Sequence, residues 1–83
     1  MEYHDGIDYR VYPNPSSGEV TIDLEEMHEE VLITLTNNLG EQEYARSFYS
    51  TELVKFSFDG DPGVFILTIK TGDKTTSLKL FKK

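Results

Sequence analysis

Apolar and polar residues alternate in several short stretches of this 83-residue chain. In the run EVTIDL, the apolar residues Val20, Ile22 and Leu24 are separated by Thr21 and Asp23. Successive side chains of a β-strand point to opposite faces of a sheet, so a period of two predicts a strand with one buried face. A chain assembled from such stretches is expected to fold as a β-sheet protein.

Seven stretches have this strand character, and clusters of glycine, proline and asparagine separate most of them. The predicted strands are residues 9–12, 19–24, 31–37, 44–49, 53–58, 64–71 and 75–81, and the predicted turns are residues 13–18, 37–41, 59–63 and 71–74. The stretch 64–71 is nearly continuous in apolar residues, which predicts a central strand covered on both faces. In the last turn, Gly72 supplies the positive φ of a tight hairpin. The acidic run EEMHEE, residues 25–30, predicts a polar loop or a single helical turn.

The spacing of these stretches predicts an all-β fold, an immunoglobulin-like antiparallel β-sandwich of about seven strands. The predicted core consists of Val20, Ile22, Ile33, Leu35, Phe56, Phe58, Phe65, Leu67 and Ile69. A chain of 83 residues is long enough for one domain. It contains no cysteine, which excludes disulfides and thiolate metal sites. No apolar run approaches the length of a membrane span, and residues 1–10 do not have the pattern of a signal peptide.

Charge is distributed unevenly along the chain, whose net charge is −7. Residues 1–69 carry 3 basic and 14 acidic side chains, a balance of −11, while residues 70–83 carry 5 lysines and one aspartate, a balance of +4. Nucleic-acid binding depends on lysine and arginine facing phosphate, so the acidic body excludes a nucleic-acid partner. Residues 70–83, which we call the basic tail, are the exception to this acidic character.

The pentapeptide VYPNP, residues 11–15, ends the first predicted strand. Pro13 and Pro15 lack N–H donors and fix φ near −65°, so this segment is unable to extend a sheet ladder. Asn14 and the following Ser-Ser-Gly supply turn-forming residues. The motif is therefore expected to turn the chain from the first strand into the second and to blunt a sheet edge.

The order of these motifs resembles a known family. VYPNPSSGEVTIDL, then ITLTNNLGE, then DPGVFILTIKTGDKTTSLKLFKK together resemble the C-terminal sorting domain of the type IX secretion system, the Por secretion system sorting family of Bacteroidetes. The resemblance covers residues 9–83. Residues 1–8 are then expected to be a linker or a remnant of cloning.

The resemblance carries over to individual positions of this sequence. The matching residues are Pro13, Asn14 and Pro15 in the proline motif, Gly40 in the central turn, Gly63 and Phe65 in the Gly-x-Tyr step, and Lys79, Lys82 and Lys83 at the basic end. Phe65 stands where the family usually has tyrosine, and Glu43 where it usually has valine. The three lysines are expected to project from one end of the acidic body.

The resemblance implies a sorting signal rather than an enzyme. Its expected partners are the type IX secretion machinery of the outer membrane, a sortase that removes the domain, and a cargo protein that precedes it. The expected route runs through the periplasm to the outer membrane and the cell surface or medium. We expect no cofactor and no catalytic residue, because the chain has no cysteine nucleophile and neither histidine lies in a motif with a nucleophilic serine.

Three other interpretations remain open from the residues alone. His28 and its neighbouring glutamates suggest a metal site, although the spacing of ligands is not that of a known site. The residues Asp59, Asp61 and Asp73 are loop carboxylates that suit calcium. The alternative function is an immunoglobulin-like accessory module that binds carbohydrate or a neighbouring domain, with Tyr3, Tyr9, Tyr44 and Tyr49 as stacking candidates.

Overall fold

The structure is a computed structural model that describes residues 9–13, 17–72 and 74–83. The described residues form five β-strands, and they contain no helix that could cross a membrane. The strands are β1 (Arg10–Tyr12), β2 (Glu19–Asn37), β3 (Gln42–Ser57), β4 (Gly63–Thr71) and β5 (Lys74–Lys82). The prediction of an all-β fold is confirmed.

The long strand β2 organises the sheet, in which all pairings are antiparallel. Its first part pairs with β1, where Val11 lies opposite Ile22, and its second part pairs with β4, where Ile33 lies opposite Ile69. The sheet order is β1-β2-β4-β5, and β3 runs along the other edge of β2. Every other strand except β5 therefore pairs directly with β2.

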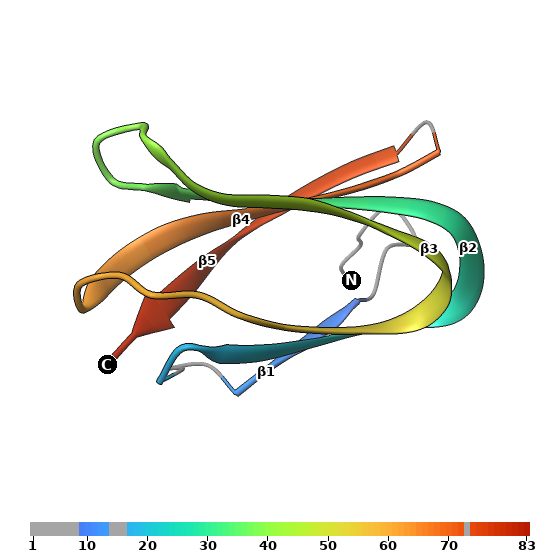
Figure 1. Ribbon diagram of the computed structural model, residues 1–83, viewed down its shortest axis with the longest axis horizontal. Coiled ribbons are helices and arrows are strands. Elements are labelled where there is room, and N and C mark those ends of the chain that lie inside the picture. The colour runs from blue at the N-terminus through green and yellow to red at the C-terminus, as the bar shows by residue number, and fades with distance from the viewer. Residues whose placement is uncertain (1–8, 14–16, 73) are drawn as a thin grey trace, which may run out of the picture.

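The hairpin of β2 and β3 bends sharply near its middle (Figure 1). Their pairing shifts from Asp23 opposite Leu53 to His28 opposite Thr51. Residues 24–27 of β2 thus stand against a single residue of β3, which is a large bulge. A bulge bends the strand that carries it and increases its twist. The whole hairpin follows that bend.

Two residues at the bend adopt positive φ angles although neither is glycine, Glu25 at 70° and Ser50 at 51°. The amide of Glu25 donates a hydrogen bond of 3.0 Å to the Asp23 carboxylate, which supports this turn of the backbone. The prediction of a polar loop or helical turn over residues 25–30 was wrong, because strand pairing resumes beyond the bulge and this run belongs to β2.

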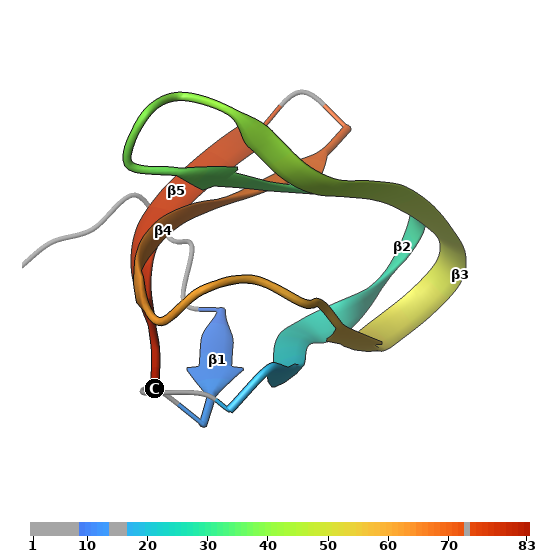
Figure 2. The same ribbon diagram turned by 60° about the vertical axis from the view of Figure 1, so that its left-hand side comes forward.

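The bend folds the sheet into two facing layers (Figures 1 and 2). One layer contains β1, the first part of β2 and the last part of β3, and the other contains β4, β5 and the remaining parts of the hairpin. The described residues form five strands where the sequence predicted seven, so the predicted immunoglobulin-like sandwich of seven strands is not confirmed. The predicted strands 19–24 and 31–37 are two parts of β2, and 44–49 and 53–58 are two parts of β3.

The core lies between the two layers. It consists of Val20, Ile22, Leu24, Val31, Ile33, Leu35, Val54, Phe56, Phe58, Phe65, Leu67, Ile69 and Leu80. All nine residues predicted for the core are buried, none more than 7% exposed. Period-two alternation identified them because each layer buries only one face.

Strand β4 has one buried face rather than two. Phe65, Leu67 and Ile69 are buried, whereas Val64 is 39% exposed and Lys70 is exposed. The prediction that this stretch is covered on both faces was wrong, because no second layer covers its outer side in the described part of the chain. The hairpin predicted after β4 is confirmed, since Thr71 pairs with Lys74 and Gly72 has a φ of 54°.

Candidate recognition surface

The segments that carry the motif residues lie at one end of the molecule (left in Figure 1). These segments are residues 13, 17–18, 37–41, 58–63 and 80–83, and we call this region the motif end. The bend of β2 and β3 and the β4–β5 turn lie at the opposite end. In Figure 2 the C-terminus again lies near the end of β1.

Gly18 connects three parts of the motif end. It is buried, its φ is 125°, and its carbonyl accepts a 2.9 Å hydrogen bond from the amide of Phe58. A Cβ built at this position would lie 3.0 Å from the Phe58 carbonyl oxygen and 3.7 Å from Cε of Lys82. The side chain of Lys82 therefore lies over the residue that leads from the proline turn into β2. Sequence reasoning placed Gly18 in a turn but did not identify this contact.

The proline motif itself is described only in part. Pro13 follows β1 directly, its side chain is exposed, and the Tyr12–Pro13 peptide bond is cis. The predicted end of the first strand at Tyr12 is confirmed. Asn14 and Pro15 lie outside the described residues.

The two C-terminal motifs are neighbours across the β4–β5 pair. Gly63 lies opposite Lys82, and Phe65 lies opposite Leu80. The φ of Gly63 is 152°, and nothing lies within 4 Å of a Cβ built on it. This glycine is therefore required for its backbone conformation and not for lack of space.

The lysines of the basic end do not share one face of β5. Lys79 lies on the outer face opposite Ile66, whereas Lys82 is half-buried and has the same parity as the buried Leu80. Lys83 follows the strand and is exposed. Lys79 and Lys82 thus lie on opposite faces of β5, because side chains alternate along a strand. The expectation that the three lysines project from one end of the acidic body stays a prediction.

The central turn is built around Asn37. Its side-chain oxygen accepts hydrogen bonds of 2.9 Å from the amides of Leu39 and Glu41, and its side-chain nitrogen donates bonds of 2.9 Å to the carboxylates of Glu41 and Glu43. Gly40 donates a 3.0 Å backbone bond to the Asn37 carbonyl and has a φ of 85°. Glu43 thus has a role in this turn. Sequence reasoning placed Asn37 at the start of the predicted turn 37–41 but did not single out its side chain, although asparagine before a turn glycine was an available signal.

A comparison with known protein families identifies the family of this chain. A family model described as the secretion system C-terminal sorting domain matches residues 10–83, from β1 to the end of the chain. The chain belongs to this family. A comparison with curated proteins gives no match. The resemblance based on the motif residues is confirmed.

Family membership makes this chain a C-terminal sorting signal for type IX secretion, a route that leads to the cell surface or the medium. The family is one of sorting signals and not of enzymes.

The motif residues of the sorting domain have two kinds of surroundings. Gly40, Gly63 and Lys83 lie at the surface of the motif end, while Phe65 is 4% exposed and packs edge-on against Phe58 with ring centroids 5.2 Å apart. Phe65 therefore supports the fold of the sorting domain from inside.

The other interpretations rest on His28, the loop aspartates and four tyrosines, of which the structure describes all but two. The described residues contain no group of three or more histidine, aspartate or glutamate side chains that could hold a metal ion, and Asp73 lies outside them. Tyr9 is half-buried and shares a 3.1 Å hydrogen bond with the Thr71 hydroxyl, and Tyr44 stacks on Phe56 at 4.7 Å. Tyr49 is 66% exposed. Tyr3 also lies outside the described residues.

Proposed function

We propose that the type IX secretion machinery recognises the folded sorting domain through its motif end. In this proposal residues 1–8 join the domain, residues 9–83, to a preceding cargo protein. The domain carries that cargo through the periplasm and across the outer membrane. A sortase then removes the domain from the cargo.

The observation that carries the proposal is the contact of Lys82 with the position of Gly18. It brings the end of β5 to the turn that follows the proline motif, although the two lie at opposite ends of the sequence. The register that sets Gly63 opposite Lys82 adds a second motif residue to the same place. A partner that binds there contacts several motif segments at once, which makes recognition depend on the fold.

A reporter fusion tests this proposal. Residues 9–83 are attached to the C-terminus of a soluble reporter that carries a signal peptide, and the fusion is expressed in a host with type IX secretion. We expect the reporter at the cell surface or in the medium, with a mass that shows loss of the domain. The same reporter without the domain should remain in the periplasm.

Two results separate the parts of the proposal. Retention of the fusion in the periplasm would contradict the sorting function. Export of the reporter with the domain still attached would leave sorting intact and contradict removal by a sortase.

A further inference from the structure

Strand β3 has an open edge. It pairs with β2 along one side, and no other strand of the described residues pairs with it. The part of β3 before the bend, residues 42–49, is long enough to accept another strand. Unpaired edge strands expose N–H and C=O groups that favour pairing with a second chain. The sorting domain therefore requires a feature that prevents such pairing.

Arg46 is the one charged residue that the described register places on the inner face of this part of β3. Residues that lie opposite each other in a pair share one face of the sheet. The three inner residues and their partners are Tyr44 opposite Leu35, Arg46 opposite Ile33, and Phe48 opposite Val31. All three partners are completely buried core residues. Arg46 thus stands on the core side of the strand, between two aromatic residues.

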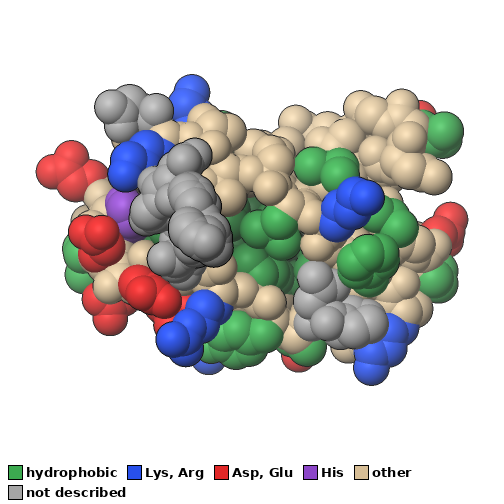
Figure 3. All heavy atoms as spheres, turned by 180° about the vertical axis from the view of Figure 1, so that it is seen from behind, with side chains coloured by type: hydrophobic (Ala, Val, Ile, Leu, Met, Phe, Trp, Pro, Cys, Tyr) green, Lys and Arg blue, Asp and Glu red, His purple; other side chains and the backbone are tan. Residues whose placement is uncertain are grey.

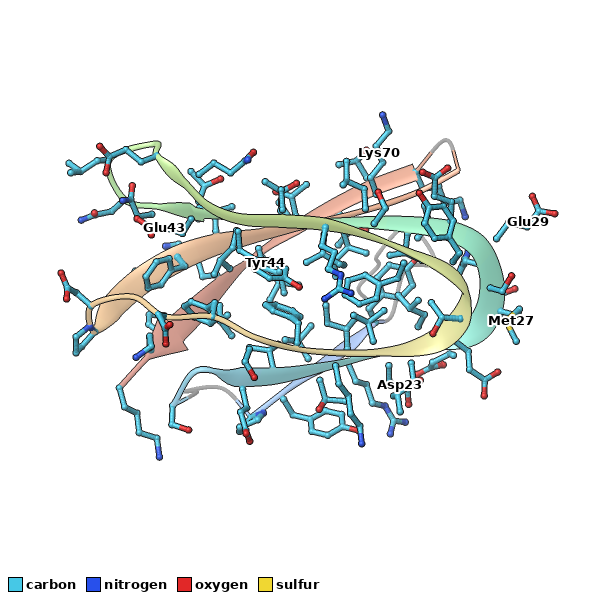
Figure 4. The ribbon with its side chains drawn as sticks, in the orientation of Figure 1. Asp23, Met27, Glu29, Glu43, Tyr44 and Lys70 are labelled. Atoms are coloured by element: carbon cyan, nitrogen blue, oxygen red, sulfur yellow. The ribbon has the colours of Figure 1, made fainter. Side chains whose placement is uncertain are left out.

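The described residues around Arg46 provide no counter-ion. Its guanidinium lies 5.4 Å from the centre of the Phe48 ring, and the residue is exposed. Within the described chain no carboxylate forms an ion pair with it. Figure 4 shows Tyr44 pointing into the space between the two layers at this edge. The charge on Arg46 is therefore stabilised by the Phe48 ring and by water.

We propose that Arg46 keeps the open edge of β3 from pairing with a second copy of this chain. A strand added beside β3 would extend the layer and cover its inner face at this edge. Arg46 would then lose water without gaining a counter-ion from the described residues, and removing an unpaired charge from water is strongly unfavourable. An inward-pointing charge on an edge strand is a known means of preventing sheet extension.

The remainder of the β3 edge is protected in another way. The positive φ of Ser50 turns the strand at the bend, so the two parts of β3 do not form one straight edge. The part after the bend, residues 53–57, is short and pairs in register with β2 at Val54 and Phe56. A short edge strand exposes few unpaired N–H and C=O groups, so it pairs poorly with a strand of another chain. Arg46 is thus placed at the centre of the longer and more vulnerable part.

Oligomeric state tests the proposal independently of the sorting function. Size-exclusion chromatography with light scattering is run over a hundredfold range of concentration. We expect Arg46→Val and Arg46→Thr to form dimers or larger species as concentration rises. The wild type and Arg46→Glu should remain monomeric, because Glu keeps a charge at the inner position. Ala45→Val, which adds the same apolar side chain on the outer face, should also behave as the wild type.

Hydrogen exchange locates the new contact. In the associated variants, amide protection should rise over residues 42–49 as concentration rises. Monomeric Arg46→Val and Arg46→Thr proteins would overturn the proposal, as would association of Arg46→Glu to the same degree. Protection that rises elsewhere in the chain would overturn it too. The threonine variant keeps the test decisive if the valine variant fails to fold.

Discussion

At the scale of single residues, two positions determine how the motif end is built. Gly18 allows the chain to approach Phe58 and Lys82, because a Cβ there would meet the Phe58 carbonyl oxygen at 3.0 Å. Asn37 holds the central turn through four side-chain hydrogen bonds. The sequence marks both as turn residues. Phe58 and Lys82, which lie against Gly18, are distant from it in the sequence. The residues next to Gly18 in the chain therefore do not reveal these contacts.

Replacing Gly18 should be more harmful than replacing Gly40. Gly18→Ala combines an unfavourable φ of 125° with the close carbonyl contact, and we expect a loss of about 3 kcal/mol in the free energy of unfolding. Gly40→Ala has a φ of 85° but open space around the new Cβ, so a loss of about 1 kcal/mol is expected. Urea denaturation measures both. Equal losses would show that the contact with Phe58 does not matter.

The two adjacent asparagines of the central turn form a matched pair. Asn37→Ala removes four hydrogen bonds, and because they are exposed we expect a loss of about 1–2 kcal/mol. Asn38 is exposed and its side chain makes no hydrogen bond with the described residues, so Asn38→Ala should change stability by less than about 0.5 kcal/mol. Thermal unfolding followed by circular dichroism compares them. An Asn37→Ala protein as stable as the wild type would show that the side chain of Asn37 does not stabilise this turn.

At the scale of strands, the sequence revealed which residues are buried but not that β2 and β3 each continue through the bend. Alternation identified the buried residues because burial of one face requires it. It did not reveal that β2 runs through residues 25–30, since five of the six side chains there are charged or histidine and no glycine marks the bulge. The bend depends on positive φ at Glu25 and Ser50, which these residue types seldom adopt.

Strand β3 offers a direct test of its buried face. Phe56 is 7% exposed and stacks on Tyr44, so Phe56→Ala should cost about 3–5 kcal/mol. Leu53 lies on the same strand with 42% exposure, and Leu53→Ala should cost less than about 1 kcal/mol. Chemical denaturation gives both values. Similar losses for the two variants would contradict the assignment of the inner face.

At the scale of the whole molecule, β5 and its extension form a basic strip on an acidic body. Residues 74–83 carry four lysines and no acid, a balance of +4, while residues 1–73 carry 4 basic and 15 acidic side chains, a balance of −11. Acidic side chains gather around the bend (Figure 3), while the motif end carries Glu41, Asp59 and Asp61 together with Lys82 and Lys83. Such an uneven charge distribution orients a molecule as it meets a partner.

The residues of the motif end could be predicted from the sequence, but the way in which the fold brings them together could not. The matching residues were identified by type and order. Their convergence depends on the β4–β5 register and on the path of the chain around the bend, which are long-range properties of the fold. The opposite faces of Lys79 and Lys82 follow from strand parity and could have been predicted.

We propose that the secretion machinery recognises the sorting domain through the motif end. Two pairs of lysines allow a matched test of this proposal. Lys70 lies on β4, Lys74 and Lys82 lie on β5, and Lys83 follows β5. Lys82 and Lys83 lie at the motif end, whereas Lys70 and Lys74 lie beside the β4–β5 turn at the other end (Figure 4). Each double replacement by alanine removes two positive charges. Lys70, Lys74 and Lys83 are exposed and Lys82 is half-buried. Since none of the four belongs to the buried core, both proteins should remain folded with melting temperatures close to that of the wild type.

The decisive measurement is the exported fraction of a reporter fused to each variant in a host with type IX secretion. We predict that Lys82→Ala with Lys83→Ala sharply reduces export, while Lys70→Ala with Lys74→Ala leaves it near the wild-type level. Equal export of the two fusions, with both domains folded, would contradict recognition through the motif end.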